Sequence, residues 1–131
     1  MSVRVDTAAL AEVIGDFGTT AYLVTVNEDH SAHVASVLVD VRGDGVLSMG
    51  AGRTSIANTR RRAAVTLLWP PDADGSYSLL VDGVAVAAAA EAEGEPDHVV
   101  VTPRSAVLHR VAGRAEDGPT CLPVDGAERP G

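Results

Sequence analysis

The chain has 131 residues, which fits one domain with a single hydrophobic core, and it carries a formal net charge of −8. All ten cationic residues are arginine, which excludes lysine Schiff-base enzymes and P-loop proteins, and the excess of acids argues against a nucleic-acid-binding face. No apolar run is long enough to cross a membrane, residues 1–6 lack the apolar segment of a signal peptide, and the single cysteine, Cys121, cannot form an internal disulfide, so we expect a cytoplasmic protein without a membrane partner.

The first predicted elements are a helix and two strands. Asp6 is an N-cap residue, the apolar residues that follow it recur at helical spacing, and we expect Gly15 and Gly18 to end this helix. Residues 21–26 and the β-branched run 33–41 then predict two strands joined by a polar turn.

A hairpin and a short helix come next. The Asp-Gly pair within residues 42–45 lies between apolar runs, which is a strong hairpin signal, and it leads into a strand over residues 46–49. A glycine break at residues 50–52, a short helix over residues 55–62 and a strand over residues 65–69 follow.

Four further apolar runs predict strands, at residues 77–81, 84–90, 99–101 and 106–111. The first two are a strand pair or one strand bent at Asp82 and Gly83. Six or seven hairpin-linked strands and two helices predict a mainly β protein, an antiparallel barrel with the helices outside, over residues 1–113. Residues 114–131 are rich in glycine, proline and acids, so we interpret them as a polar C-terminal tail.

The most informative segment is residues 53–62, which contains four arginines, three hydroxyl residues and no acid. It follows a strand and a glycine break, so the start of its helix presents free backbone N–H groups. Arg53, Thr54 and Ser55 at that position favour a phosphate ligand, and the alternative is an exposed helix start with a solvated arginine.

Three arginines, at residues 60–62, end the same helix. Cations stabilise a helix C-terminus, so we interpret these arginines as solvated. The functional alternative is that one of them reaches a second acidic group of the ligand.

From His33 to Trp69 the chain resembles the FMN-binding split barrels of the pyridoxamine 5′-phosphate oxidase-like superfamily, and the match continues more weakly to Gly83. The shared order is a strand, an Asp-Gly hairpin, a strand, a glycine break, an arginine and hydroxyl segment, a helix with Asn58 before two arginines, and a Val-Thr-Leu-Leu-Trp strand. The resemblance implies an antiparallel six-stranded split β-barrel with two short outer helices, which forms a homodimer with FMN in a groove between the subunits.

The resemblance also implies cofactor contacts by position. They are Ala35, Ser36 and Val37 along the isoalloxazine edge, Ser48 and Met49 beside the ribityl chain, Arg53, Thr54 and Ser55 at the phosphate, and Ser78 as a further polar contact. The oxidase proper carries Ser-Arg-Lys where this chain has the Arg53 triplet, so two cations of the family pattern are replaced by hydroxyls. The oxidase's substrate-binding C-terminal segment has no counterpart after Arg114, so oxidation of pyridoxine phosphate is not expected.

Three functions remain open from the sequence. The leading hypothesis is a homodimeric FMN oxidoreductase that transfers hydride at flavin N5 to a small-molecule substrate, without a catalytic side chain. The second is an F420-dependent reductase that uses the same groove, with the arginines at residues 60–62 facing the cofactor's glutamate tail. The third is a non-catalytic split barrel that has lost the cofactor.

The remaining distinctive residues are interpreted as structural. His30 and His33 flank a turn without a third ligand, so no metal site is expected. His98 and His109 are expected at surface or core positions of late strands, and Trp69 is expected in the core or at a dimer contact. Cys121 has no basic neighbour in the sequence and is expected to be unreactive.

Overall fold

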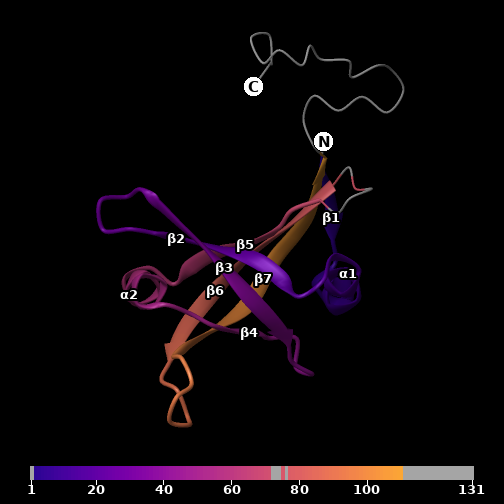
Figure 1. Cartoon of the computed structure of the whole chain (residues 1–131). Coiled ribbons are helices and arrows are strands. Elements are labelled where there is room, and N and C mark those ends of the chain that lie inside the picture. Colours follow the sequence, from indigo (N-terminus) through magenta and orange to yellow (C-terminus); the bar gives the residue numbers. More distant parts are fainter. Residues whose placement is uncertain (1, 72–74, 76, 111–131) are drawn as a thin grey trace, which may run out of the picture.

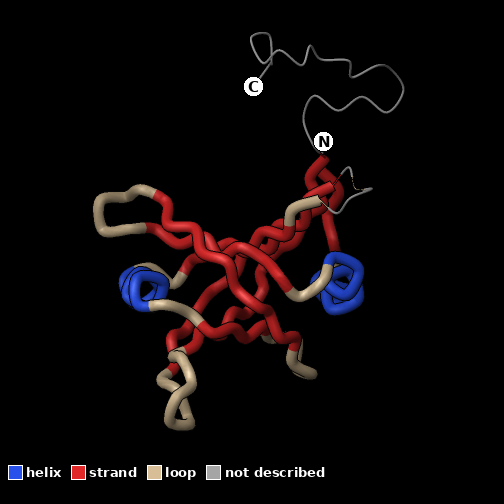
Figure 2. Tube along the Cα trace, viewed as in Figure 1, coloured by secondary structure: helices blue, strands red, loops and turns tan. Residues whose placement is uncertain are grey.

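The computed structural model describes residues 2–71, 75 and 77–110, and this part of the chain forms seven strands and two α-helices (Figures 1 and 2). The strands are β1 (Ser2–Val5), β2 (Thr20–Val26), β3 (Ala32–Val41), β4 (Leu47–Gly50), β5 (Ala64–Trp69), β6 (Tyr77–Ala88) and β7 (His98–Arg110). The helices are α1 (Leu10–Phe17), which follows the 3-10 turn η1 (Thr7–Ala9), and α2 (Arg53–Arg61). Cys121 and the tail expected at residues 114–131 lie outside the described residues. No helix in the described part has the length and apolar character needed to span a membrane.

The strands close into an antiparallel barrel. They are ordered β7, β4, β3, β2, β5 and β6, and β6 pairs again with β7 to complete the ring of six. β1 is an additional strand that pairs with β7 outside this ring. In Figure 1, α1 and α2 lie on opposite sides of the barrel. The predicted mainly β, six-stranded antiparallel barrel with two short outer helices is therefore confirmed, whereas β1 is a strand that the sequence pattern did not predict.

The barrel interior is filled by apolar side chains that alternate along the strands. In β2, Ala21 and Leu23 are buried while Tyr22 between them is exposed, because successive strand residues point to opposite faces. Trp69 at the end of β5 is fully buried, and its indole Nε1 donates a hydrogen bond to the carbonyl oxygen of Gly18 at 2.9 Å. Trp69 is thus a core residue, which was the first of the two roles expected for it.

The first helix begins as predicted and ends at the second of the two glycines that were predicted to end it. Asp6 caps η1, since its carboxylate accepts the backbone N–H of Ala8 at 3.0 Å. Gly18 is the C-terminal cap of α1 with φ of 96°, a backbone conformation that glycine adopts without strain. Gly15 lies inside α1, so the prediction that it ends the helix is wrong. The helix continues to Phe17, whose side chain packs against the core.

β6 and β7 are each one continuous strand. For β6 this is the bent single strand that the sequence left as one option, whereas the prediction of two separate late strands is wrong for β7. The register between them shifts, because Asp82 lies opposite Ser105 and Gly83 lies opposite Pro103. Arg104 is therefore an extra residue in β7, which defines a β-bulge.

Two residues allow this bulge to form. A Cβ atom at Gly83 would lie 2.6 Å from both the carbonyl oxygen of Thr102 and a methyl group of Val101, so only glycine fits there without a shift of the backbone. Pro103 lacks an N–H donor and lies between Val101, the last partner of β4, and Ala106, the first partner of β1. In the described part of the chain, this stretch of β7 has a strand partner on the β6 side alone, which is where a sheet tolerates proline.

Candidate anion-binding site at the start of α2

The first turn of α2 has backbone donors without helical partners. Its N-cap residue is Gly52, which supplies no side-chain cap, and the first N–H to reach back is that of Ile56, which donates to the carbonyl oxygen of Gly52 at 3.0 Å. The N–H groups of Arg53, Thr54 and Ser55 precede it and have no acceptor within the helix. The helix thus starts two residues earlier than predicted, so the Arg53 triplet forms its first turn.

The triplet presents one cation and two hydroxyls. Arg53 and Thr54 are exposed, and within the described part of the chain Arg53 makes no ion pair and no side-chain hydrogen bond. Ser55 is only 1% exposed, yet its hydroxyl has no hydrogen-bond partner among the described residues. A hydroxyl without a hydrogen bond, uncapped N–H groups and a helix dipole favour an anion at this position.

The position of this first turn is fixed by the loop between β6 and β7. The backbone N–H of Ala51 donates to the carbonyl oxygen of Asp97 at 2.9 Å. Gly50 lies against the ring of Pro96, where an added Cβ would approach the proline Cγ to 3.1 Å. Ile56, one turn into α2, is buried in the barrel core. These contacts orient the start of α2 relative to the barrel.

A buried polar network holds α2 against the end of β2. Asn58 is 1% exposed, and its side-chain amide donates to Thr25 Oγ1 at 3.0 Å and to Asn27 Oδ1 at 2.9 Å. The same side chain accepts a hydrogen bond from the guanidinium of Arg61. The side-chain NH2 of Asn58 thus bonds to residues at the end of β2, and its Oδ1 bonds to an arginine of α2. These hydrogen bonds fix the orientation of α2 about its own axis relative to β2.

The arginines at the end of α2 are exposed, in agreement with the solvated interpretation. Arg60 has no side-chain partner in the described part of the chain, whereas Arg61 contacts Asn58. The guanidinium of Arg62 lies 2.9 Å from His30 Nδ1, in the turn between β2 and β3. His30 has a φ of 73° there, and turn geometry accounts for its position.

The same turn contains Asp29, whose pKa is lowered by hydrogen bonds. The hydroxyl and the backbone N–H of Ser31 both donate to the carboxylate of Asp29, at 2.5 and 3.0 Å. These two hydrogen bonds, the hydroxyl first, lower the pKa of Asp29 below its ordinary value because they favour the ionised form. The turn beside α2 therefore carries both a carboxylate and an arginine–histidine contact.

The predicted β3 residues lie in the middle of the barrel wall. Ser36 is exposed on the outer face, directly opposite Tyr22 of β2. Val37 is buried and points into the core, and Ala35 is half-buried. Only the backbone groups of Val37 are therefore oriented for a contact with a ligand outside the barrel.

The other predicted residues are more widely spread. Met49 of β4 is buried in the core, and Ser48 is buried as well, with Arg42 Nη2 donating to Ser48 Oγ at 3.3 Å. Ser78 lies at the start of β6 opposite His109, far along the strand from the Ala88 end that adjoins the start of α2. Within one chain, the structure thus places the Arg53 triplet beside the β4 residues and leaves Ser78 apart.

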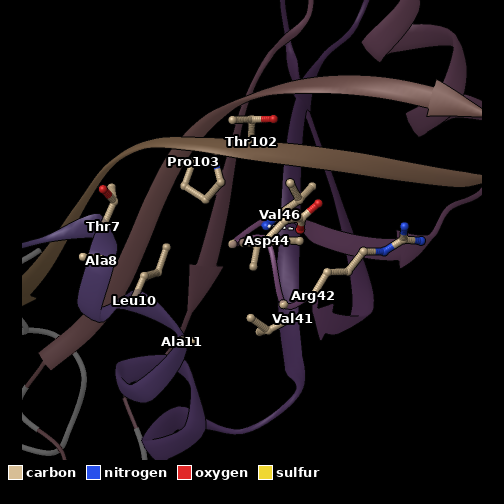
Figure 3. Close-up of a pocket in the computed structure, with 13 residues that line it drawn as sticks. Thr7, Ala8, Leu10, Ala11, Val41, Arg42, Asp44, Val46, Thr102 and Pro103 are labelled. Carbon is tan, nitrogen blue, oxygen red and sulfur yellow. Dashed lines mark hydrogen bonds between the residues drawn. The ribbon is translucent and has the colours of Figure 1, made fainter.

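Three cavities of the described part lie elsewhere. The largest, about 740 Å³, lies between the first helical turns and the β3–β4 hairpin, with Leu10, Val41 and Pro103 among its walls (Figure 3). A second of about 430 Å³ follows the seam of β1 and β7, and a third of about 370 Å³ lies on the outer face of β5 and β6. None of the nine predicted cofactor residues lines these three cavities.

Comparison with known proteins identifies close relatives. No family model matches the chain. The "Uncharacterized protein Mb0449c" of Mycobacterium bovis and the "Uncharacterized protein MT0457" of Mycobacterium tuberculosis are each 39% identical to it over 127 residues, covering 89% of this chain and 87% of theirs. The chain belongs to the same family as these two mycobacterial proteins.

Solved structures show the fold that this family adopts. A Listeria innocua protein assigned as a pyridoxamine 5′-phosphate oxidase superposes with a TM-score of 0.61 at 17% identity, covering 78% of this chain and 96% of that one. An F420 reductase superposes with a TM-score of 0.55 at 18% identity, covering 67% and 88%. The protein Rv2991 of Mycobacterium tuberculosis gives 0.63 at 16% identity, covering 80% and 85%. The chain therefore has the split-barrel fold of pyridoxamine 5′-phosphate oxidase-like proteins, as the sequence resemblance implied.

Proposed function

We propose that this chain is one subunit of a homodimeric, FMN-binding oxidoreductase that acts on a small-molecule substrate. The observation that carries the proposal is the first turn of α2, where Arg53 has no acidic partner and the hydroxyl of Ser55 makes no hydrogen bond within the described part of the chain. Three backbone N–H groups without helical acceptors complete a site suited to a phosphate. The fold shared with a protein assigned as a pyridoxamine 5′-phosphate oxidase supports a flavin phosphate as the occupant.

The residues present fit the rest of the cofactor through their backbone and small side chains. Ser36 on the outer face of β3 and the backbone of its neighbours would lie along the flavin ring, and Ser48 would face the ribityl chain if Arg42 moved aside. FMN supplies the redox chemistry by accepting or donating hydride at N5. The protein's part is to hold the phosphate, orient the ring and exclude water, so no side-chain acid or base is assigned.

An apolar surface supports the homodimer. Leu38, Val34 and Tyr22 are 69%, 56% and 37% exposed on β2 and β3. The pairs Thr20–Leu38, Tyr22–Ser36 and Val24–Val34 place these side chains on one outer face. A second copy of the chain would bury this face and supply the other wall of the cofactor groove.

The dimer is tested by the mass in solution of two matched variants. We expect Leu38→Glu to shift the protein to a monomer and to lower FMN affinity, because the dimer would bury a charge in an apolar contact. Val3→Glu changes an exposed valine of β1, beyond β7, and should leave both unchanged. A dimer that survives Leu38→Glu would place the interface elsewhere.

A second candidate is an F420-dependent reductase that uses the same groove. The specific observation in its favour is the exposed run of cations at the end of α2, in which Arg60 has no partner among the described residues. The F420 reductase with the same fold supports this candidate. The glutamate tail of F420 would extend toward these arginines.

Titration of the purified protein with each cofactor separates the candidates. Arg53→Ala should weaken FMN binding about tenfold or more, since a charge-assisted hydrogen bond contributes roughly 1.5–3 kcal/mol. Arg60→Ala should leave FMN affinity unchanged and weaken F420 if the second candidate holds. Unchanged FMN affinity in Arg53→Ala would remove the helix start from the site. A protein that binds neither cofactor would be the non-catalytic barrel that the sequence left as a third possibility.

A further inference from the structure

We propose that the cavity between β1 and the bulge of β7 is a second ligand site, which binds a small molecule carrying a phosphoryl group. The cavity has a volume of about 430 Å³ and is lined by residues of three elements, namely Arg4, Val5, Asp6, Thr7, Arg104, Ser105 and Ala106. It uses no residue of the proposed flavin site, and in Figure 1 β1 and α2 lie on different sides of the barrel. The inference therefore does not rest on the proposed function.

The bulge of β7 directs Arg104 to this cavity. Arg104 is the extra residue of β7, opposite neither Asp82 nor Gly83, and a bulged residue leaves the regular alternation of the strand. Gly83 and Pro103 both favour the bulge, one by lacking a Cβ and the other by lacking an N–H. The sequence thus specifies an irregularity of the strand at the position of Arg104.

The partner arginine comes from β1. Arg4 pairs with Val107 of β7, and side chains of directly paired residues lie on the same face of a sheet. Ser105 lies two residues before Val107, so its hydroxyl is on that face as well. Two guanidinium groups and the hydroxyls of Ser105 and Thr7 therefore line one cavity, with the buried side chains of Val5 and Ala106 beneath them.

The lining of this cavity holds two arginines and one acid, Asp6. Neither Arg4 nor Arg104 makes an ion pair there, although the whole chain carries a net charge of −8. The one acid of the lining, Asp6, accepts the backbone N–H of Ala8 and caps η1. Asp82, beside Arg104 in the neighbouring cavity, accepts the hydroxyl of Thr66 at 2.5 Å. Both nearby carboxylates are thus engaged in other contacts.

The donor set favours a phosphoryl group over a carboxylate. One guanidinium satisfies both oxygens of a carboxylate, whereas a phosphate monoester has three terminal oxygens and nearly two negative charges, so it can accept from two arginines and a hydroxyl together. The volume lies in the range of small-molecule sites and exceeds what an inorganic phosphate fills. A phosphorylated metabolite with a short organic part is therefore the expected class of ligand.

The test uses inorganic phosphate and phenyl phosphate as probes, titrated at low salt into the full chain carrying Arg53→Ala, which weakens anion binding at the start of α2. Binding is followed by calorimetry and by amide chemical shifts. We expect shifts at Thr7 and Ser105, tighter binding of phenyl phosphate, and a loss of about tenfold or more in affinity for Arg4→Ala and for Arg104→Ala.

The control is Arg60→Ala, which removes an exposed arginine of α2 and should change nothing. Arg104→Lys keeps the charge and should recover part of the affinity, which shows that a folding defect is not the cause of the loss. Equal losses for Arg60→Ala and Arg104→Ala, or shifts confined to other residues, would mean nonspecific attraction and would overturn the proposal.

Discussion

Replacing Asn58 by alanine is expected to destabilise the protein by roughly 2–4 kcal/mol, because it removes the network between α2 and β2. Thr25 is 1% exposed and loses the amide that reaches its hydroxyl at 3.0 Å, and a buried polar group left without a partner costs about 1–3 kcal/mol. Asn27 is half-buried and Arg61 is exposed, so water replaces their lost contacts and they add only about 0–1 kcal/mol. The cavity left by the side chain accounts for the remainder.

Urea unfolding measures this loss as a fall in the midpoint at constant slope. The double variant Thr25→Val and Asn58→Ala isolates the buried hydrogen bond, since removing both partners should cost less than the sum of the two single changes. Arg60→Ala, on the exposed face of the same helix, should change stability by less than about 0.5 kcal/mol. If Asn58→Ala costs no more than this control, or if the two single changes simply add, the network does not hold the helix.

Two further predictions concern the bulge between β6 and β7 and the turn between β2 and β3. Gly83→Ala places a Cβ 2.6 Å from the carbonyl oxygen of Thr102 and should lower the free energy of unfolding by about 1–3 kcal/mol, measured in urea. Gly43→Ala is the control, because there is open space around Gly43, and it should be near neutral. Equal effects of the two changes would contradict the close packing at the bulge. Asp29 has a lowered pKa in the fold, so its stabilisation is present above the ordinary carboxyl pKa and is lost as the pH falls through the lowered value. Ser31→Ala removes the largest cause and should raise the pKa of Asp29 in a carbon NMR titration, and an unchanged pKa would reject the hydrogen bond as that cause.

Local sequence signals predicted most of the barrel because its strands are joined by hairpins with recognisable turns. The Asp-Gly pair between β3 and β4 gave the correct hairpin, and alternating apolar residues gave the correct strands on either side. β1 escaped prediction because it has four residues and a single partner, β7, which lies more than a hundred residues away. β7 was divided at Pro103 because the condition that makes a proline tolerable there, a stretch of β7 between the partners of β4 and β1, depends on strands that are distant in sequence.

The candidate site was predicted in part. A glycine break before an arginine and two hydroxyls correctly located a helix start with free N–H groups. Asn58 was noted as part of a resemblance, but its hydrogen bonds join residues 33 and 31 positions away, and no local pattern indicates such a pairing. The hydrogen bond from Arg42 to Ser48 likewise depends on the conformation of the hairpin between β3 and β4.

The two proposed sites follow from one physical condition, namely backbone that leaves regular pairing. At the start of α2 a glycine cap leaves N–H groups without acceptors, and at the bulge of β7 the strand loses its neighbour on one side. Each interruption carries an arginine, Arg53 or Arg104, that has no acidic partner in the described part of the chain. Because the two proposed sites share no residue, we expect removal of one arginine to leave anion binding at the other unchanged.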